Sequence, residues 1–137
     1  MKLLIVDDEK LTREGILKSL PLEKLGIHQT FLADDGIHGL KIALKEKPDL
    51  ILTDVRMPRM SGVEMAEEIL KVLPNAIILF MSAYSDKEYL KAAIKLKAVS
   101  YVDKPLDMNE LTEALAEGIH QYRSMYTSLN AQWMHED

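Results

Sequence analysis

The sequence has 137 residues, of which 47% are hydrophobic and 28% are charged, a composition typical of one soluble globular domain. It contains no cysteine, which excludes a disulfide framework, a thiolate metal site and a cysteine nucleophile. The formal net charge of −5, from 22 acidic and 17 basic residues, does not indicate a nucleic-acid-binding surface. Because the apolar runs are too short for a signal peptide or a membrane span, we expect a cytoplasmic protein.

Short apolar runs alternate with segments of helical periodicity along the chain, and the alternation predicts ten elements. Ser61 and Glu64 have the spacing of a capping box at a helix start, and Asp107 and Glu110 repeat it. Asp86 can cap the predicted helix that lies between these two in the sequence. In chain order we predict a strand at 2–6, a helix at 11–20, a strand at 29–33, a helix at 36–46, a strand at 49–53, a helix at 61–73, a strand at 76–81, a helix at 86–97, a strand at 99–102 and a helix from 107.

This order of elements predicts the fold class. Strands that are apolar throughout and alternate with helices indicate an α/β fold, a doubly wound five-stranded parallel sheet with helices on both faces. Ligands of such sheets bind beyond the carboxyl ends of the strands. Residues with polar or reactive side chains follow every strand at that edge: Asp7 and Asp8 after the first, Asp54 after the third, Ser82 with Ala83 after the fourth, and Lys104 after the fifth. Asp34 and Asp35 follow the second strand, which should be an edge strand with its loop off to one side.

Each of these residues alone has an ordinary structural explanation. Asp8 could cap a helix, Ser82 could belong to a turn, and Lys104 could be a solvated surface lysine. Their coincidence at one edge of the sheet favours a site. Asp7 and Asp8 cannot both cap one helix well.

Crowded carboxylates repel one another, and a bound divalent cation is the usual remedy. A ligand set made up entirely of oxygen atoms selects a hard cation, Mg²⁺ above all. A carboxylate nucleophile, Mg²⁺, a lysine and a hydroxyl group together suit phosphoryl transfer, in which an aspartate can accept the phosphoryl group as an acyl phosphate.

The ordered set of motifs resembles the receiver domain of two-component response regulators. The motifs are DD after the first strand, DVRMP at Asp54, SA at Ser82 and YVDKP around Lys104. The resemblance covers residues 2–123 and implies the flavodoxin-like strand order 2-1-3-4-5. Each motif alone is weak, but the ordered set is highly specific.

The resemblance also implies a metal site and a phosphoacceptor. Asp54 corresponds to the phosphoacceptor. Asp8, Asp54 and the backbone carbonyl of Arg56 correspond to the Mg²⁺ ligands. Asp7 corresponds to the carboxylate that holds a metal-bound water. Lys104 corresponds to the lysine that pairs with the acyl phosphate.

Further roles follow from the same resemblance. Ser82 corresponds to the hydroxyl that moves to a phosphoryl oxygen, and Tyr101 to an aromatic switch that is exposed in the inactive state. A half-buried strand tyrosine is the alternative for Tyr101. Arg56 and Tyr84 flank the site, with Ala83, and tune loss of the phosphoryl group. The family places a cis bond before the proline that follows the lysine, here Pro105.

Two features lie outside the motifs. The family commonly has Gly-Ala before the fifth strand, where this chain has Lys97-Ala98. Apolar residues also continue with heptad spacing past the expected end of the domain at 123, which predicts a helical extension at 124–137 and a parallel homodimer. The alternative is that the first half packs on the sheet and the last turns fray. The residues of the seam are Leu115, Ile119, Tyr122, Tyr126, Leu129 and Trp133.

The resemblance implies a signalling switch rather than an enzyme with an external substrate. A sensor histidine kinase would phosphorylate Asp54, and the face formed by the helix at 86–97, the strand at 99–102 and the last helix would transmit the change. The closest resemblance is to receivers of regulators with an AraC-type DNA-binding module, which this sequence does not contain. The alternatives are an Asp-based Mg²⁺-dependent phosphohydrolase and a pseudo-receiver that serves only as an interaction module.

Overall fold

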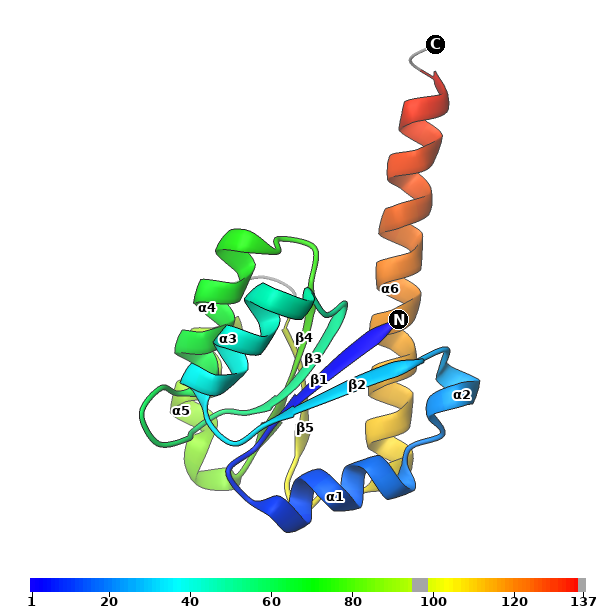
Figure 1. Cartoon of the computed structure of the whole chain (residues 1–137). Helices are drawn as coiled ribbons and strands as arrows, with labels where there is room; N and C mark the ends of the chain where they lie inside the picture. Colours follow the sequence, from blue (N-terminus) through cyan, green and yellow to red (C-terminus); the bar gives the residue numbers. More distant parts are fainter. Residues whose placement is uncertain (95–98, 136–137) are drawn as a thin grey trace.

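Five parallel strands form one sheet, and helices pack on both of its faces (Figure 1). The computed structural model describes residues 1–94 and 99–135, with side chains throughout except at positions 89, 92–94, 99 and 128–135. The elements are β1 (Lys2–Val6), α1 (Lys10–Ser19), α2 (Leu22–Leu25), β2 (Gln29–Ala33), α3 (Gly36–Glu46), β3 (Leu50–Asp54), α4 (Gly62–Val72), β4 (Ile77–Ser82), the 3-10 helix η1 (Tyr84–Asp86), α5 (Lys87–Ile94), β5 (Val99–Asp103) and α6 (Met108–His135).

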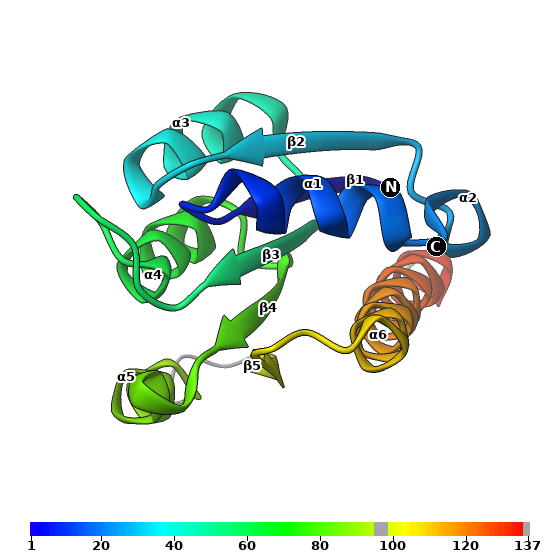
Figure 2. The ribbon, with the colours of Figure 1, turned by 90° about the horizontal axis from the view of Figure 1, so that it is seen from below.

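The strand order is β2-β1-β3-β4-β5, and every neighbouring pair is parallel. This confirms both the predicted fold class and the order 2-1-3-4-5. The order reverses beside β1, which places the carboxyl ends of β1 and β3 side by side. Figure 2 shows α3, α4 and α5 on one face of the sheet and α1, α2 and α6 on the other.

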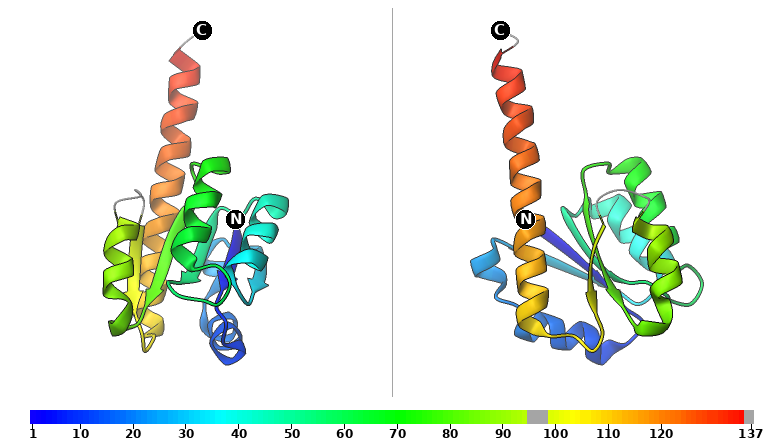
Figure 3. Two further views of the ribbon diagram at one scale, coloured as in Figure 1. Left: turned by 90° about the vertical axis from the view of Figure 1, so that its left-hand side faces the viewer. Right: turned by 180° about the vertical axis from the view of Figure 1, so that it is seen from behind.

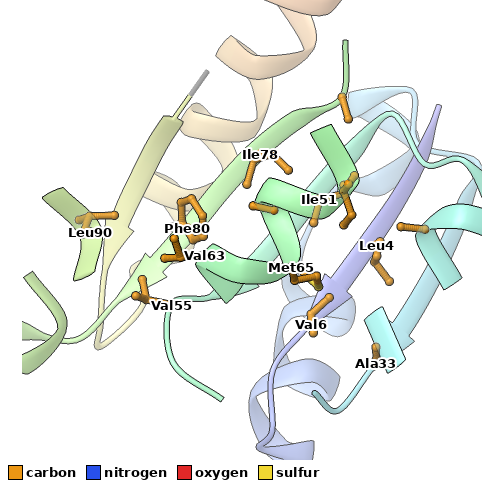
Figure 4. Packing of buried hydrophobic residues seen from close by; sticks show 14 residues of the cluster. Leu4, Val6, Ala33, Ile51, Val55, Val63, Met65, Ile78, Phe80 and Leu90 are labelled. Carbon is orange, nitrogen blue, oxygen red and sulfur yellow. The ribbon is translucent and has the colours of Figure 1, made fainter. Parts of the chain in front are cut away.

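Alternating residues of each strand fill two separate hydrophobic clusters. Leu4 and Val6 of β1 point into the cluster under α3, α4 and α5 (Figure 4), whereas Leu3 and Ile5 point into the cluster under α1 and α6. All four side chains are fully buried. This explains why the strands are continuously apolar, because a strand covered on both faces has no solvent-facing positions.

The structure differs from the predicted elements in small ways. A short helix, α2, occupies the connection after Pro21 that the sequence analysis left unassigned; it ends at Gly26, whose φ of +78° is easily adopted by glycine. Asp86 ends the turn of η1, which runs directly into α5. The predicted departure at Lys97-Ala98 lies outside the described residues.

Helix α6 is much longer than the other helices and extends well beyond the sheet (Figures 1 and 3). Its first half covers the sheet, with Leu115 and Ile119 buried, as expected. Farther along, Tyr126 is 61% exposed. Within the described ranges 1–94 and 99–135, none of the helices combines the length and the hydropathy needed to cross a bilayer.

Candidate functional site

Three carboxylates gather at the carboxyl edge of the sheet, where the sequence predicted a site. Asp7 follows β1, and Asp54 is the last residue of the neighbouring β3. The register pairs Val6 with Thr53, so the residues that come next, Asp7 and Asp54, lie side by side. Oxygen atoms of Asp7, Asp8 and Asp54 lie within 4.8 Å of one another, a spacing suited to one metal ion.

Lys104 joins two of these carboxylates. Its Nζ donates to Asp7 Oδ2 at 3.0 Å and to Asp54 Oδ2 at 3.1 Å. Asp7 is fully buried, and its other oxygen, Oδ1, accepts from the backbone N–H of Glu9 at 2.8 Å. Asp8, in contrast, is exposed. The two adjacent aspartates therefore have different surroundings.

The charges of the site perturb one another. Burial raises the pKa of Asp54 to about 6; Lys104 opposes this shift, and the nearby carboxylates of Asp7 and Asp8 add to it. Burial also disfavours the charge on Lys104, but Asp54 and Asp7 outweigh that effect and raise the lysine pKa. Lys104 thus does not offset the cost of placing Asp54 in a crowded, desolvated position.

The site fits a hard cation. Its donors are carboxylate oxygens, and the one from Asp8 is exposed. Mg²⁺ prefers one or two carboxylates together with waters and phosphate oxygens, so the exposed side of this cluster suits it.

The strand ends on the far side of β3 carry the predicted hydroxyl group and the lysine. Ser82 is fully buried, and its Oγ donates to the carbonyl of Ala83 at 3.2 Å. The Ser82 carbonyl accepts from the backbone N–H of Lys104 at 2.9 Å, which ties β4 to the turn after β5. The Lys104–Pro105 peptide bond is cis, as the resemblance implies.

The predicted switch residue lies on the edge strand β5. The ring of Tyr101 is on the surface, with 44% of the residue exposed. Lys87, the first residue of α5, places its Nζ 4.7 Å from the ring centroid and forms an ion pair with Asp103. Tyr84, the first residue of η1 after β4, is 90% exposed.

Two ion pairs in the loop after Asp54 had no signal in the sequence. Arg56 lies 3.8 Å from the buried carboxylate of Asp86, and Arg59 pairs with the buried Asp35. Gly62, which begins α4, lies so close to Asp54 that an added Cβ would be 1.9 Å from the Asp54 carbonyl oxygen. The glycine was visible in the sequence, but only the packing of α4 against β3 shows why no side chain fits.

Comparisons with known proteins identify the family of this chain and agree with its fold. Residues 3–116 match the family model of the response regulator receiver domain. The chain belongs to the response regulator receiver family. Domains of this family are switches in two-component signalling rather than enzymes that turn over an external substrate, and they bind Mg²⁺ at an acidic cluster.

Curated relatives include transcriptional regulators. The chain is 37% identical over 110 residues to the transcriptional regulatory protein HptR from Staphylococcus aureus, covering 80% of this chain and 43% of that protein. It is 35% identical over 114 residues to a response regulatory protein from Staphylococcus epidermidis, covering 83% of this chain and 45% of that protein. The chain thus spans less than half the length of these relatives.

Solved structures of similar domains extend the comparison. A two component transcriptional regulator AraC from Clostridium phytofermentans is 50% identical with a TM-score of 0.84, over 90% of this chain and 98% of that one. The REC domain of AraT, a response regulator from Geobacillus stearothermophilus, is 30% identical with a TM-score of 0.86, over 91% and 97%. The resemblance to receivers of AraC-type regulators is thereby confirmed.

Proposed function

We propose that the domain is a phosphorylation-operated switch in which Asp54 accepts a phosphoryl group from the phosphohistidine of a sensor histidine kinase. The observation that carries the proposal is the convergence of Asp7, Asp8, Asp54 and Lys104 at one edge of the sheet. Such a partner also suggests a cytoplasmic location.

In the transfer, an Asp54 carboxylate oxygen attacks the phosphorus atom. A P–O bond forms, the P–N bond to the histidine breaks, and its electron pair stays on the imidazole nitrogen. The pKa of about 6 leaves most of Asp54 ionised at pH 7, so the nucleophile is available. Lys104 Nζ lies 3.1 Å from Asp54 Oδ2, which supports its proposed pairing with a phosphoryl oxygen.

Asp8, Asp54 and the backbone carbonyl of Arg56 would hold Mg²⁺, and Asp7 would hold a coordinated water. When bound, the ion supplies positive charge that offsets the charge developing on the phosphoryl oxygens. Asp7 is committed to Lys104 and to the Glu9 N–H, whereas Asp8 is exposed, which supports giving direct contact to Asp8.

A phosphoryl group adds a charge of about −1.5 to −2 to the site. We propose that Ser82 then turns from the Ala83 carbonyl to a phosphoryl oxygen and that Tyr101 moves inward. The face made by α5, β5 and α6 would thereby change shape. Tyr84, Arg56, Ala83 and Pro105 border the site, where the first two would tune how fast water removes the phosphoryl group.

We further propose that residues 1–123 form the receiver and that the part of α6 beyond residue 123 leads toward a DNA-binding effector module. The longer curated relatives, some of them transcriptional regulators, support this view. The exposure of Tyr126 supports a parallel homodimer through the extension. Sedimentation with a beryllofluoride mimic and Mg²⁺ would reveal a dimer, and a monomer at high concentration would contradict it.

Two other functions are less well supported. Phosphohydrolases that use an aspartyl phosphate usually have a second aspartate two residues after the nucleophile as the general acid, a position occupied here by Arg56. A generic phosphate ester should therefore show no sustained turnover. A pseudo-receiver would not need the complete set of three carboxylates and a lysine.

Incubation with Mg²⁺ and acetyl phosphate, followed by intact mass measurement, tests the proposed function. We expect the mass of one phosphoryl group to be added, only when Mg²⁺ is present. Asp54→Asn should prevent the addition. No added mass in the unaltered chain, or the same addition in the variant, would contradict the role of Asp54.

A further inference from the structure

The segment that connects Asp54 to α4 is anchored on several sides. We call residues 55–61 the acceptor loop. Met57 and Met60 pack against the hydrophobic cluster under α3, α4 and α5. The Val55 carbonyl accepts from the backbone N–H of Gly62 at 2.9 Å. These contacts fix the two ends of the loop, while Arg59 near its tip makes a contact with another element.

That contact is an ion pair with Asp35, the residue before α3. Arg59 Nε donates to Asp35 Oδ2 at 2.8 Å, and Nη2 of the same guanidinium group contacts the same oxygen. The carboxylate is nearly buried, and its other oxygen, Oδ1, accepts from the backbone N–H of His38 at 2.8 Å. The N–H of His38 and the Arg59 charge outweigh burial and lower the Asp35 pKa.

The loop approaches Asp35 at a backbone cost. Arg59 has a φ of +69°, a left-handed conformation that is unfavourable for a residue with a Cβ. Beside the pair, an added Cβ on Gly36 would lie 2.3 Å from the Met60 carbonyl oxygen. The loop after β3 and the start of α3 are therefore closely fitted as well as ion-paired.

We propose that Arg59 and Asp35 are positioning residues for the Mg²⁺ site, because their ion pair holds the acceptor loop that carries the Arg56 carbonyl. Neither residue belongs to the proposed set of Mg²⁺ ligands. The inference rests on the proposed function, since it requires the Arg56 carbonyl to be a ligand. Removing either partner should loosen the loop and weaken Mg²⁺ binding.

The signs of the charges separate this role from simple electrostatics. Replacing Asp35 by a neutral residue removes a negative charge, which would weaken cation binding through long-range attraction alone. Replacing Arg59 removes a positive charge, which by itself would strengthen it. Positioning predicts weaker binding in both cases, so the Arg59 variant is the decisive one.

Two substitutions preserve the local backbone while breaking the pair. Asp35→Asn keeps a side chain that can cap α3, because asparagine is as good an N-cap residue as aspartate. Arg59→Asn keeps a residue that tolerates the left-handed conformation. Glu68→Gln is the control, since it removes one carboxylate from an exposed ion pair with Lys71 on α4.

Titration with MgCl₂ in a calorimeter, at a temperature where thermal melts show each variant fully folded, gives the dissociation constants. We expect both variants to raise the Mg²⁺ Kd by about tenfold, as is typical for groups that support a metal ligand. The double variant should bind Mg²⁺ no more weakly than either single variant, because the two residues act as one unit. Glu68→Gln should leave the Kd unchanged.

An Arg59→Asn variant that binds Mg²⁺ as tightly as the unaltered chain, or more tightly, would overturn the inference, even if its melting temperature falls. If the unaltered chain itself binds no Mg²⁺, the proposed metal site fails and this inference fails with it. The two failures are distinguished by the titration of the unaltered chain.

Discussion

At the scale of single residues, Asp7 and Asp8 are neighbours with different surroundings. Asp7 is fully buried and bonded to Lys104 and to the Glu9 N–H, so it is part of the folded framework of the site. Asp8 is exposed and has an oxygen within reach of the other two carboxylates. Among the residues that the structure describes, Asp8 forms no ion pair that a cation from solvent would have to break.

This difference predicts that Asp8→Ala weakens Mg²⁺ binding more than Asp7→Ala does. Asp7→Ala should instead lower the free energy of unfolding, because Lys104 loses a buried partner. Calorimetric titration with MgCl₂ gives the first effect, and urea unfolding without Mg²⁺ gives the second. Comparable losses of Mg²⁺ affinity in the two variants would remove the distinction.

Asp54 gives a prediction about pH and stability. Its pKa is about 6 in the folded state and 3.8 in the unfolded chain, so the folded state binds the proton more tightly. Without Mg²⁺, the stability that this residue contributes is present below about pH 4 and is lost as the pH rises to about 6.

Asp54→Asn should therefore stabilise the Mg²⁺-free domain at pH 7, by an amount on the order of 2 kcal/mol. The gain over the unaltered chain should shrink as the pH falls from about 6 to about 4. Urea unfolding at several pH values measures it. A variant that is less stable at pH 7, or a gain that does not change with pH, would show that burying the charged Asp54 carboxylate does not destabilise the domain.

At the scale of elements, a hydrogen bond joins α6 to Asp49, the residue that precedes β3. Tyr122 Oη donates to Asp49 Oδ1 at 2.8 Å, and Asp49 Oδ2 accepts from the backbone N–H of Lys2 at 2.8 Å. This bond raises the pKa of Tyr122 to about 12. The hydrogen bond thus fixes α6 near the point where the helix extends beyond the sheet.

Tyr122→Phe should lower the free energy of unfolding by about 1 kcal/mol, because it removes this bond and leaves the Asp49 oxygen with one donor fewer. Tyr126→Phe is the matched control on the same helix, since that tyrosine is largely exposed. Urea unfolding of both variants measures the difference. Equal stabilities would show that the bond does not anchor α6.

The elements were predicted well because their signals are local. Apolar runs bounded by polar residues mark the strands, and side chains such as Ser61 and Asp107 do cap α4 and α6 as their spacing predicts. The boundaries of β3 and β4 moved by one residue, so that Asp54 and Ser82 end strands rather than follow them. Helix α2 was missed because its four residues are too few to show a periodicity.

At the scale of the whole molecule, the site depends on contacts between residues far apart in the sequence. Strand order and the ordered motifs were enough to predict that Asp7, Asp54 and Lys104 meet. The pairs Arg59–Asp35 and Arg56–Asp86 could not be predicted from the sequence. Their members lie in segments that follow different strands, and no sequence spacing relates such segments to one another. These pairs link the loop after β3 to the loops on both sides of it.

The same arrangement suggests how a local change reaches the surface. Lys104 touches the carboxylates, its N–H bonds to the Ser82 carbonyl, and Tyr101 lies three residues earlier on β5. A new charge on Asp54 would act on a strand that also borders α5 and α6. We propose that the long α6 carries that change beyond the sheet.

The central claim, that Asp54 is the phosphoacceptor, is tested most directly by locating the phosphoryl group. After incubation with Mg²⁺ and acetyl phosphate, borohydride reduces an aspartyl phosphate to homoserine, which peptide mass spectrometry can place in the sequence. We predict homoserine at position 54 and none there when Mg²⁺ is omitted. Homoserine at Asp7, Asp8 or another aspartate, with position 54 unchanged, would contradict the account.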